Sequence, residues 1–168
     1  MRNFLFKLFM LLCLLPAAAT AQDVELKEFT WIKQQFKMNV PDVQIVQESD
    51  SMAQLEGPQA RIYVWAEDRS LTTEEDCVLW MMDQARKNKA DWNNATFKYS
   101  FGKRSVGAYI YCPYDSGEGG IQTMGIYCGI DKESRRIYTV IAFLWEDARS
   151  AIEQVISSPD VMDINWQY

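Results

Sequence analysis

The segment that most constrains the fold is Arg136–Trp145, RIYTVIAFLW, which lies near the C-terminal end of the chain. Successive residues of a strand point to opposite faces, and here both faces carry apolar side chains, many of them β-branched or aromatic. A strand with one solvent-exposed face would alternate apolar and polar residues. The run is also short for a membrane-spanning helix, which needs about 20 apolar residues. The segment therefore predicts a central β-strand covered on both faces.

A helix is predicted directly after this strand. The segment Glu146–Ser157, EDARSAIEQVIS, repeats apolar side chains at helical spacing. Glu146 and Asp147 lie in the first turn, where acidic side chains interact favourably with the helix dipole. Pro159 predicts that the helix ends just before it. We expect this helix to cover one face of the sheet.

A second helix is predicted over Thr73–Lys89, where Thr72 and Glu75 have the spacing of a capping box. Leu79 and Trp80 lie off its apolar stripe. Two interpretations follow: they pack under the C-terminal tail, or they form an exposed patch that binds a partner. The tail is favoured, because scattered apolar residues on a surface are ordinary.

The remaining apolar runs predict strands that are joined by short turns. The runs cover residues 36–40, 43–47, 52–55, 60–67, 96–101, 106–112 and 121–130. Short turns imply antiparallel pairing. The sequence therefore predicts an α+β domain, in which two main helices flank a central antiparallel sheet.

The first 21 residues have the features of a signal peptide. Arg2 and Lys7 form a basic region, Leu8–Leu15 is apolar, and Ala19-Thr20-Ala21 has the small-x-small pattern of a cleavage site. We expect export to the periplasm or the extracellular space, and a mature chain that begins at Gln22 and is not embedded in a membrane. The predicted organisation is a signal peptide over 1–21, a flexible leader over 22–28, one domain over 29–158 and a C-terminal tail over 159–168.

The predicted mature chain is acidic. The formal net charge of the whole sequence is −6, and removal of the basic Arg2 and Lys7 makes it −8. A strong negative charge disfavours nucleic acid and anionic lipid as partners. The partners that remain are a protein or a small ligand.

Cys77, Cys112 and Cys128 remain after the predicted cleavage. In an oxidising compartment they allow one disulfide and one thiol, or three buried thiols. The sequence has no histidine, which excludes Ser-His-Asp and Cys-His catalysis and removes the commonest partner in a zinc site. No cofactor or metal is expected.

The layout of the chain is similar to that of a known superfamily. The similar features are Phe36–Pro41, FKMNVP, the predicted helix over 73–89 and Ala151–Ser158, AIEQVISS, which together span most of residues 29–158. In this layout the chain resembles the PsbP-like superfamily, which includes a photosystem extrinsic subunit, a Ran-binding protein and many secreted bacterial proteins. The resemblance implies a central antiparallel sheet with helices on both sides and a binding or assembly role. It assigns no functional residue.

Aromatic side chains are the candidates for ligand binding. Trp65, Tyr109, Tyr111 and Tyr127 lie on strands that are expected to be neighbours. If they share a face, they can stack on sugars, peptides or apolar ligands. The alternative is that they form the core under the helices, and the strand register decides between the two.

The leading interpretation is a non-enzymatic exported domain that binds a protein or a small ligand. One alternative is a carboxylate-dependent hydrolase, for which Glu67 with Asp68 or Asp115 with Glu118 could supply paired acids. Another is a structural subunit of an envelope assembly, which would present a symmetric interface.

Overall fold

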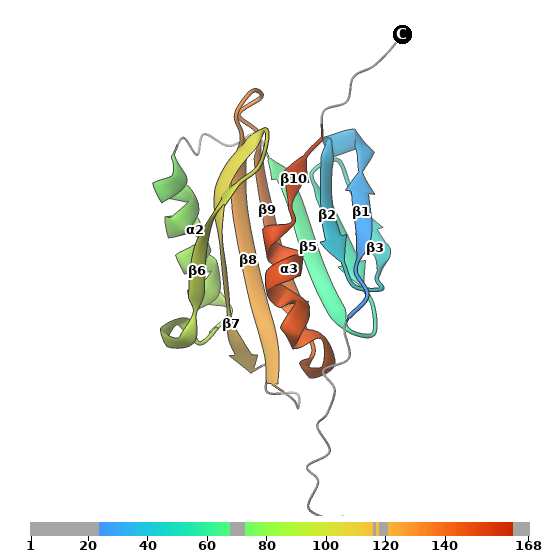
Figure 1. Ribbon diagram of the computed structural model, residues 1–168, viewed down its shortest axis with the longest axis vertical. Helices are drawn as coiled ribbons and strands as arrows, with labels where there is room; N and C mark the ends of the chain where they lie inside the picture. The colour runs from blue at the N-terminus through green and yellow to red at the C-terminus, as the bar shows by residue number, and fades with distance from the viewer. Residues whose placement is uncertain (1–23, 68–72, 116, 118–120, 163–168) are drawn as a thin grey trace, which may run out of the picture.

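The computed structural model describes residues 24–67, 73–115, 117 and 121–162. Over these residues the chain forms two antiparallel sheets, two α-helices and three short 3-10 helices (Figure 1). The strands are β1 (Lys27–Trp31), β2 (Phe36–Val40), β3 (Gln44–Glu48), β4 (Met52–Glu56), β5 (Ala60–Glu67), β6 (Thr96–Phe101), β7 (Ser105–Asp115), β8 (Ile121–Asp131), β9 (Ile137–Leu144) and β10 (Asp160–Val161). The helices are η1 (Ile32–Gln34), α2 (Glu74–Lys87), η2 (Trp92–Asn94), η3 (Glu146–Ala151) and α3 (Ile152–Ser157). The predicted α+β fold with a central antiparallel sheet and two flanking α-helices is confirmed.

β9 is the middle strand of the large sheet, whose order is β3-β4-β5-β9-β8-β7-β6. It pairs with β5 on one side and β8 on the other, and all its residues except Phe143 are buried. Val140 belongs to the core under α3, whereas Ile141 belongs to the core under α2. The predicted central strand with cover on both faces is therefore confirmed.

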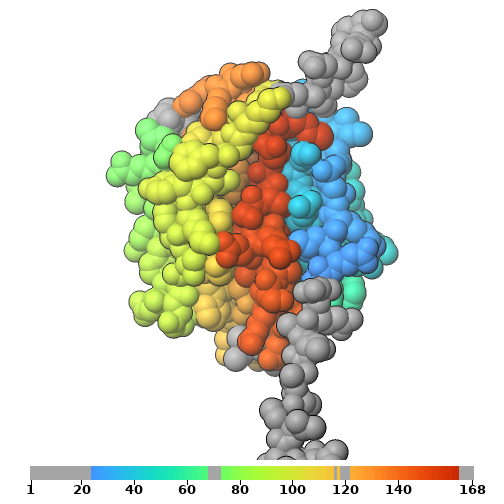
Figure 2. All heavy atoms as spheres, viewed as in Figure 1, coloured from blue at the N-terminus to red at the C-terminus, as the bar shows by residue number. Residues whose placement is uncertain are grey.

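One face of the sheet is covered by α3 together with a small second sheet, and Figure 2 shows the red atoms of the C-terminal segment beside the blue atoms of the N-terminal strands on this face. The single helix predicted over Glu146–Ser157 is divided into η3 and α3. Gly125 of β8 lets α3 lie close, because a Cβ atom there would come within 2.8 Å of Ile152 Cδ1. We name this side of the large sheet the α3 face.

The small sheet has the order β1-β2-β10, and the sequence did not predict it as a separate sheet. Its buried residues Trp31, Phe36 and Met38 belong to the same core as the α3-face residues of β4 and β5. The sheet extends past both expected domain limits, 29 and 158, since β1 begins at Lys27 and β10 pairs with β2. Val161 of β10 is buried, so a tail segment takes part in the core.

The other face, which we name the α2 face, is covered by α2. This helix buries Cys77, Met81 and Ala85 against β7 and β8. The capping box predicted for Thr72 and Glu75 is wrong by one residue: Thr73 Oγ1 accepts from the amide of Asp76 at 3.2 Å, and Asp76 Oδ2 accepts from the amide of Thr73 at 3.1 Å. The later start places Cys77 in the first turn and directs it at the sheet.

Candidate functional site

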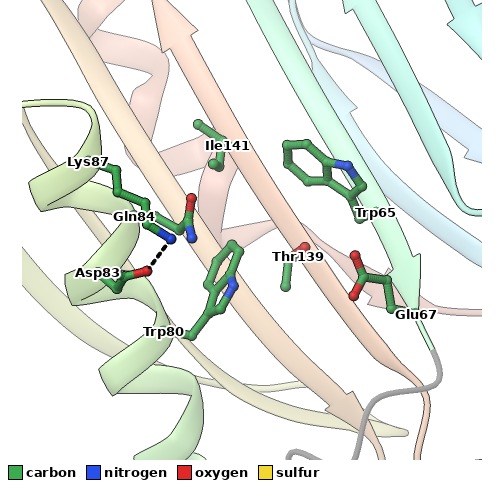
Figure 3. Close-up of a pocket in the computed structure, with 8 residues that line it drawn as sticks. All are labelled: Trp65, Glu67, Trp80, Asp83, Gln84, Lys87, Thr139 and Ile141. Carbon is green, nitrogen blue, oxygen red and sulfur yellow. Dashed lines mark ion pairs between the residues drawn. The ribbon is translucent and has the colours of Figure 1, made fainter.

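An open groove runs along the α2 face between α2 and β5, with β9 as its floor. It forms because α2 packs on β7 and β8 and does not cover β5. The groove has a volume of about 410 Å³. We name it the α2 groove, and its lining residues are Trp65, Glu67, Trp80, Asp83, Gln84, Lys87, Thr139 and Ile141 (Figure 3).

Two tryptophans from different elements form the aromatic walls of the α2 groove. Trp65 faces it because β5 alternates, with Val64 and Ala66 buried in the core of the α3 face. The ring of Tyr63 stacks on Trp65 with centroids 5.7 Å apart and an interplanar angle of 15°. Trp80 extends from α2 toward the sheet, and Figure 3 shows Thr139 between the two indoles. Both indoles are partly exposed, so each has area left for a ligand.

Polar groups of several kinds line the same groove. Glu67 supplies a carboxylate, Gln84 an amide and Thr139 a hydroxyl. Asp83 and Lys87 form an ion pair of 2.6 Å on the exposed flank of α2. Exposed pairs of this kind contribute little to stability, so both side chains can turn to a ligand at small cost. The α2 groove thus offers donors and acceptors beside aromatic surface.

The four aromatic residues predicted to bind a ligand do not form one surface. The strand register places Tyr109 and Tyr127 opposite each other on the α3 face, where both are buried, whereas Trp65 lies on the α2 face. Of the four, only Trp65 lines the α2 groove. Tyr109 and Tyr127 have the core environment that was the alternative interpretation, and the partly exposed Tyr111 packs against that core.

Tyr109 and Tyr111 also hold α3 through Glu153. The Tyr111 hydroxyl donates to Glu153 at 2.7 Å and the Tyr109 hydroxyl at 3.4 Å, while Lys98 forms an ion pair with the same carboxylate. Lys98, followed by the tyrosine hydroxyls, lowers the pKa of Glu153. The hydrogen bond to Glu153 raises the pKa of Tyr111, and burial is the main cause that raises the pKa of Tyr109. This cluster attaches α3 to β7.

Leu79 and Trp80, the predicted partner patch, point in different directions from α2. Leu79 is 60% exposed, whereas Trp80 lines the α2 groove. The favoured interpretation, that both pack under the C-terminal tail, is not supported by the described part of the tail. β10 lies in the small sheet on the opposite face of the large sheet.

Cys77, Cys112 and Cys128 lie on the α2 face, where all three are buried. The thiol of Cys128 donates to Cys77 Sγ at a distance of 2.8 Å. This hydrogen bond is the main cause that lowers the pKa of Cys77. Burial raises the pKa of Cys112 to about 11. Across the described ranges, no group of three or more cysteine or acidic side chains is placed to hold a metal ion.

A second aromatic feature was not identified from the sequence. Phe97, Tyr99 and Phe101 on β6 are 40%, 53% and 73% exposed, although they alternate like residues of a buried face. They lie on the α2 face of β6, the edge strand of the large sheet, and they are exposed because α2 packs on β7 and β8 and does not extend over β6. Strand order is the information that the sequence lacked.

The solved structures that are similar to the chain include the following three. A protein of Bacteroides thetaiotaomicron VPI-5482 aligns with a TM-score of 0.52 and 16% identity over 84% of this chain and 50% of its own, so the chain spans half the length of that protein. A mutant of protein Mog1 aligns with a TM-score of 0.52 and 10% identity over 83% of this chain and 97% of its own. The chain has the fold of Mog1. PsbP of Synechocystis sp. PCC 6803 is also similar, with a TM-score of 0.46 and 13% identity over 88% of this chain and 98% of its own.

The resemblance expected from the sequence is borne out only as a likeness of fold to Mog1. At these identities the likeness to Mog1 and to the Bacteroides protein shows the fold alone. The sequence matches no protein-family model, and a search of curated proteins finds no match.

Two findings bear on the membrane and on export. Within residues 24–67, 73–115, 117 and 121–162, no helix combines the length and the apolar character needed to cross a bilayer. The predicted signal peptide, residues 1–21, lies outside the described residues.

Proposed function

We propose that this chain is an exported, non-enzymatic binding domain and that the α2 groove binds a saccharide. The observation that carries the proposal is the placement of Trp65 and Trp80 on two elements that border one groove, with polar side chains between and beside them. Export is inferred from the basic, apolar and small-residue regions of residues 1–21.

The chemistry of a sugar ring matches the two kinds of surface in the α2 groove. One face of the ring is lined with C–H groups and packs on an indole, while its hydroxyl groups donate and accept hydrogen bonds. Glu67, Gln84 and Thr139 supply the corresponding acceptors and donors. The stack of Tyr63 on Trp65 stabilises the orientation of that indole, which reduces the conformational entropy lost on binding.

Binding is favoured over hydrolysis by the exposed position of Asp83, one of the acids that line the α2 groove. The α2 groove contains two carboxylates, Glu67 and Asp83. Glycoside hydrolysis requires one acid that is protonated near neutral pH, which usually means burial in an apolar site. Asp83 instead is exposed and forms an ion pair with Lys87.

The proposal predicts that the two tryptophans act together in ligand binding. Titration of the protein with maltose, cellobiose and chitobiose should change its tryptophan fluorescence for at least one sugar, with a Kd of about 10 µM to 1 mM. Trp65→Ala and Trp80→Ala should each weaken that affinity about tenfold, because each removes a stacking surface. Isothermal titration calorimetry measures the affinity independently of the indoles.

Phe101→Ala is the matched control, since it removes an exposed aromatic ring outside the groove. It should leave the affinity unchanged. If none of the three sugars binds, or if both tryptophan variants keep the affinity of the original protein, the α2 groove is not a saccharide site.

A second candidate function, assembly with another copy of the chain, is favoured by β6. The sequence Phe97–Phe101, FKYSF, places its three aromatic residues symmetrically about Tyr99. If two β6 edges pair antiparallel about a two-fold axis at Tyr99, Phe97 of each copy lies opposite Phe101 of the other, and Lys98 lies opposite Ser100. Cross-strand aromatic pairs stabilise a sheet, and this register avoids opposing like charges. The other edge strand, β3, has an irregular register at Ile45–Gln47, and such irregularities discourage edge pairing.

Assembly through β6 predicts a dimer, and a substitution of Tyr99, at the two-fold axis, should weaken it. Tyr99→Asp should reduce the association constant at least about tenfold, because two carboxylates would then face each other across the axis. Size-exclusion chromatography with light scattering over a concentration series measures this change. Leu79→Asp, on the exposed side of α2, should leave the dimer intact. A monomer at all concentrations would exclude this candidate.

A further inference from the structure

Cys77 and Cys128 are 51 positions apart in the sequence, and their Sγ atoms lie 2.8 Å apart. We propose that these two residues form a disulfide that joins α2 to β8, while Cys112 remains a thiol. The contact joins α2 to β8 and is independent of what the α2 groove binds.

The backbone already places the two sulfur atoms at nearly bonding distance. An S–S bond is about 2.05 Å long, so the two sulfurs need to approach by less than about 1 Å. Cys77 lies in the first turn of α2 and Cys128 in the middle of β8, and both side chains are fully buried. A small rotation of the side chains can supply this approach without moving the helix across the sheet.

The register of the hairpin excludes Cys112 as the partner of Cys128. Cys112 is paired with Met124, whereas Cys128 is paired with Ala108. Positions 108 and 112 are four residues apart on β7, which corresponds to about 13 Å at 3.3 Å per residue. Bridged cysteines have Cα atoms within about 7 Å of each other. Cys77 Sγ is in contact with Cys128 Sγ, so Cys128 is the partner that the geometry offers to Cys77.

The reaction is a two-electron oxidation by thiol–disulfide exchange with a disulfide oxidant. A thiolate of the pair attacks the oxidant disulfide, which releases one oxidant thiolate and gives a mixed disulfide. The second cysteine of the pair, as a thiolate, then displaces the other oxidant sulfur. The product is one Sγ–Sγ bond, and the oxidant leaves as two thiols with the two protons of the cysteines. Because both cysteines are fully buried in the folded chain, the exchange takes place before α2 packs on the sheet.

The bond would hold the element that carries one wall of the α2 groove. α2 buries only one stripe of side chains, and Trp80 follows Cys77 by less than one turn. A covalent link at Cys77 keeps this turn on β8 when the rest of the helix moves. It also closes a long loop, and this closure lowers the conformational entropy of the unfolded chain.

Peptide mapping of the full chain tests the proposal directly. The chain is refolded in a buffer of reduced and oxidised glutathione, unfolded in guanidinium chloride and alkylated without reductant. Trypsin leaves Cys112 and Cys128 together in the peptide 105–132, so cyanogen bromide is added to cleave after Met124. The expected product links the Cys77 peptide to the peptide 125–132, and Cys112 is alkylated. Alkylation of both Cys77 and Cys128, or a link from Cys112 to either of them, would overturn the proposal.

A thermal measurement gives a second, independent readout. The Tm of the oxidised protein should exceed that of the reduced protein by about 10 °C. Cys112→Ala should keep this difference, while Cys77→Ala should abolish it. An equal Tm for the two forms of the original protein would contradict a disulfide that constrains the fold.

Discussion

Replacing Val140 with asparagine is expected to lower the free energy of unfolding by about 4 kcal/mol. Val140 is fully buried on the α3 face of the central strand. The substitution removes about 2 kcal/mol of apolar burial and leaves a buried amide without partners, at a cost of about 1–3 kcal/mol. Because small domains are stable by about 5–15 kcal/mol, this single change removes a large share of the total.

The same substitution at the neighbouring residue is the control. Thr139 belongs to the same strand but lines the α2 groove on the opposite face. An asparagine there can bond with water or with Gln84, so we expect Thr139→Asn to cost less than about 1.5 kcal/mol. Urea unfolding followed by circular dichroism gives both values. If Val140→Asn and Thr139→Asn lowered the free energy of unfolding equally, the two faces of β9 would be equally covered and the α2 groove would be closed.

The sequence alone was enough to predict the elements that are specified by residues close together in the chain. The apolar run of β9 predicted a central strand, and the alternation in Ala60–Glu67 gave the bounds of β5 as the structure has them. Capping chemistry located the start of α2 to within one residue: the sequence predicts a cap at Thr72, and the cap is the adjacent Thr73. In these cases the side chains that decide the structure are close in the sequence.

Prediction of the candidate site required the strand register and the packing of α2, which involve residues far apart in the sequence. Trp65 and Tyr127 lie on opposite faces because of the register of β5, β9 and β8, and a shift of one residue in any pair would reverse this. The α2 groove exists because α2 packs on β7 and β8 and leaves β5 uncovered. The small sheet likewise joins β10 to β2, and no turn or spacing in the sequence indicates that pairing.

Asp131→Asn is expected to destabilise the protein by about 3 kcal/mol at neutral pH. The side chains of Asp131 and Arg104 are 2% and 15% exposed, and Arg104 Nη2 lies 3.0 Å from Asp131 Oδ2. The carboxylate also accepts from the Ser134 hydroxyl at 2.6 Å and from the amides of Glu133 and Ser134, each at 3.3 Å. An amide in its place removes the buried negative charge beside a nearly buried guanidinium, next to which the exposed Glu133 carboxylate and the Met162 carbonyl remain.

The matched control is Asp50→Asn. Asp50 forms an ion pair with Lys33, but its side chain is 87% exposed. Because water replaces such a contact readily, the substitution should produce no measurable change in urea unfolding at neutral pH. If Asp50→Asn and Asp131→Asn lowered the free energy of unfolding by similar amounts, burial of the Asp131–Arg104 ion pair would not determine its contribution to stability.

The effect of Asp131→Asn is also expected to depend on pH. Burial by itself would raise the pKa of Asp131, but hydrogen bonds from Ser134 and the Glu133 amide, together with Arg104, outweigh burial and hold the pKa below its ordinary value. A carboxyl group whose pKa is lower in the folded state stabilises the protein fully above the unfolded pKa of about 3.9. This contribution is lost as the pH falls through the lower folded value. The difference in stability between the original protein and Asp131→Asn should therefore be constant above about pH 5 and shrink toward pH 2. A constant difference down to pH 2 would mean that Asp131 acts through its shape and not through its charge.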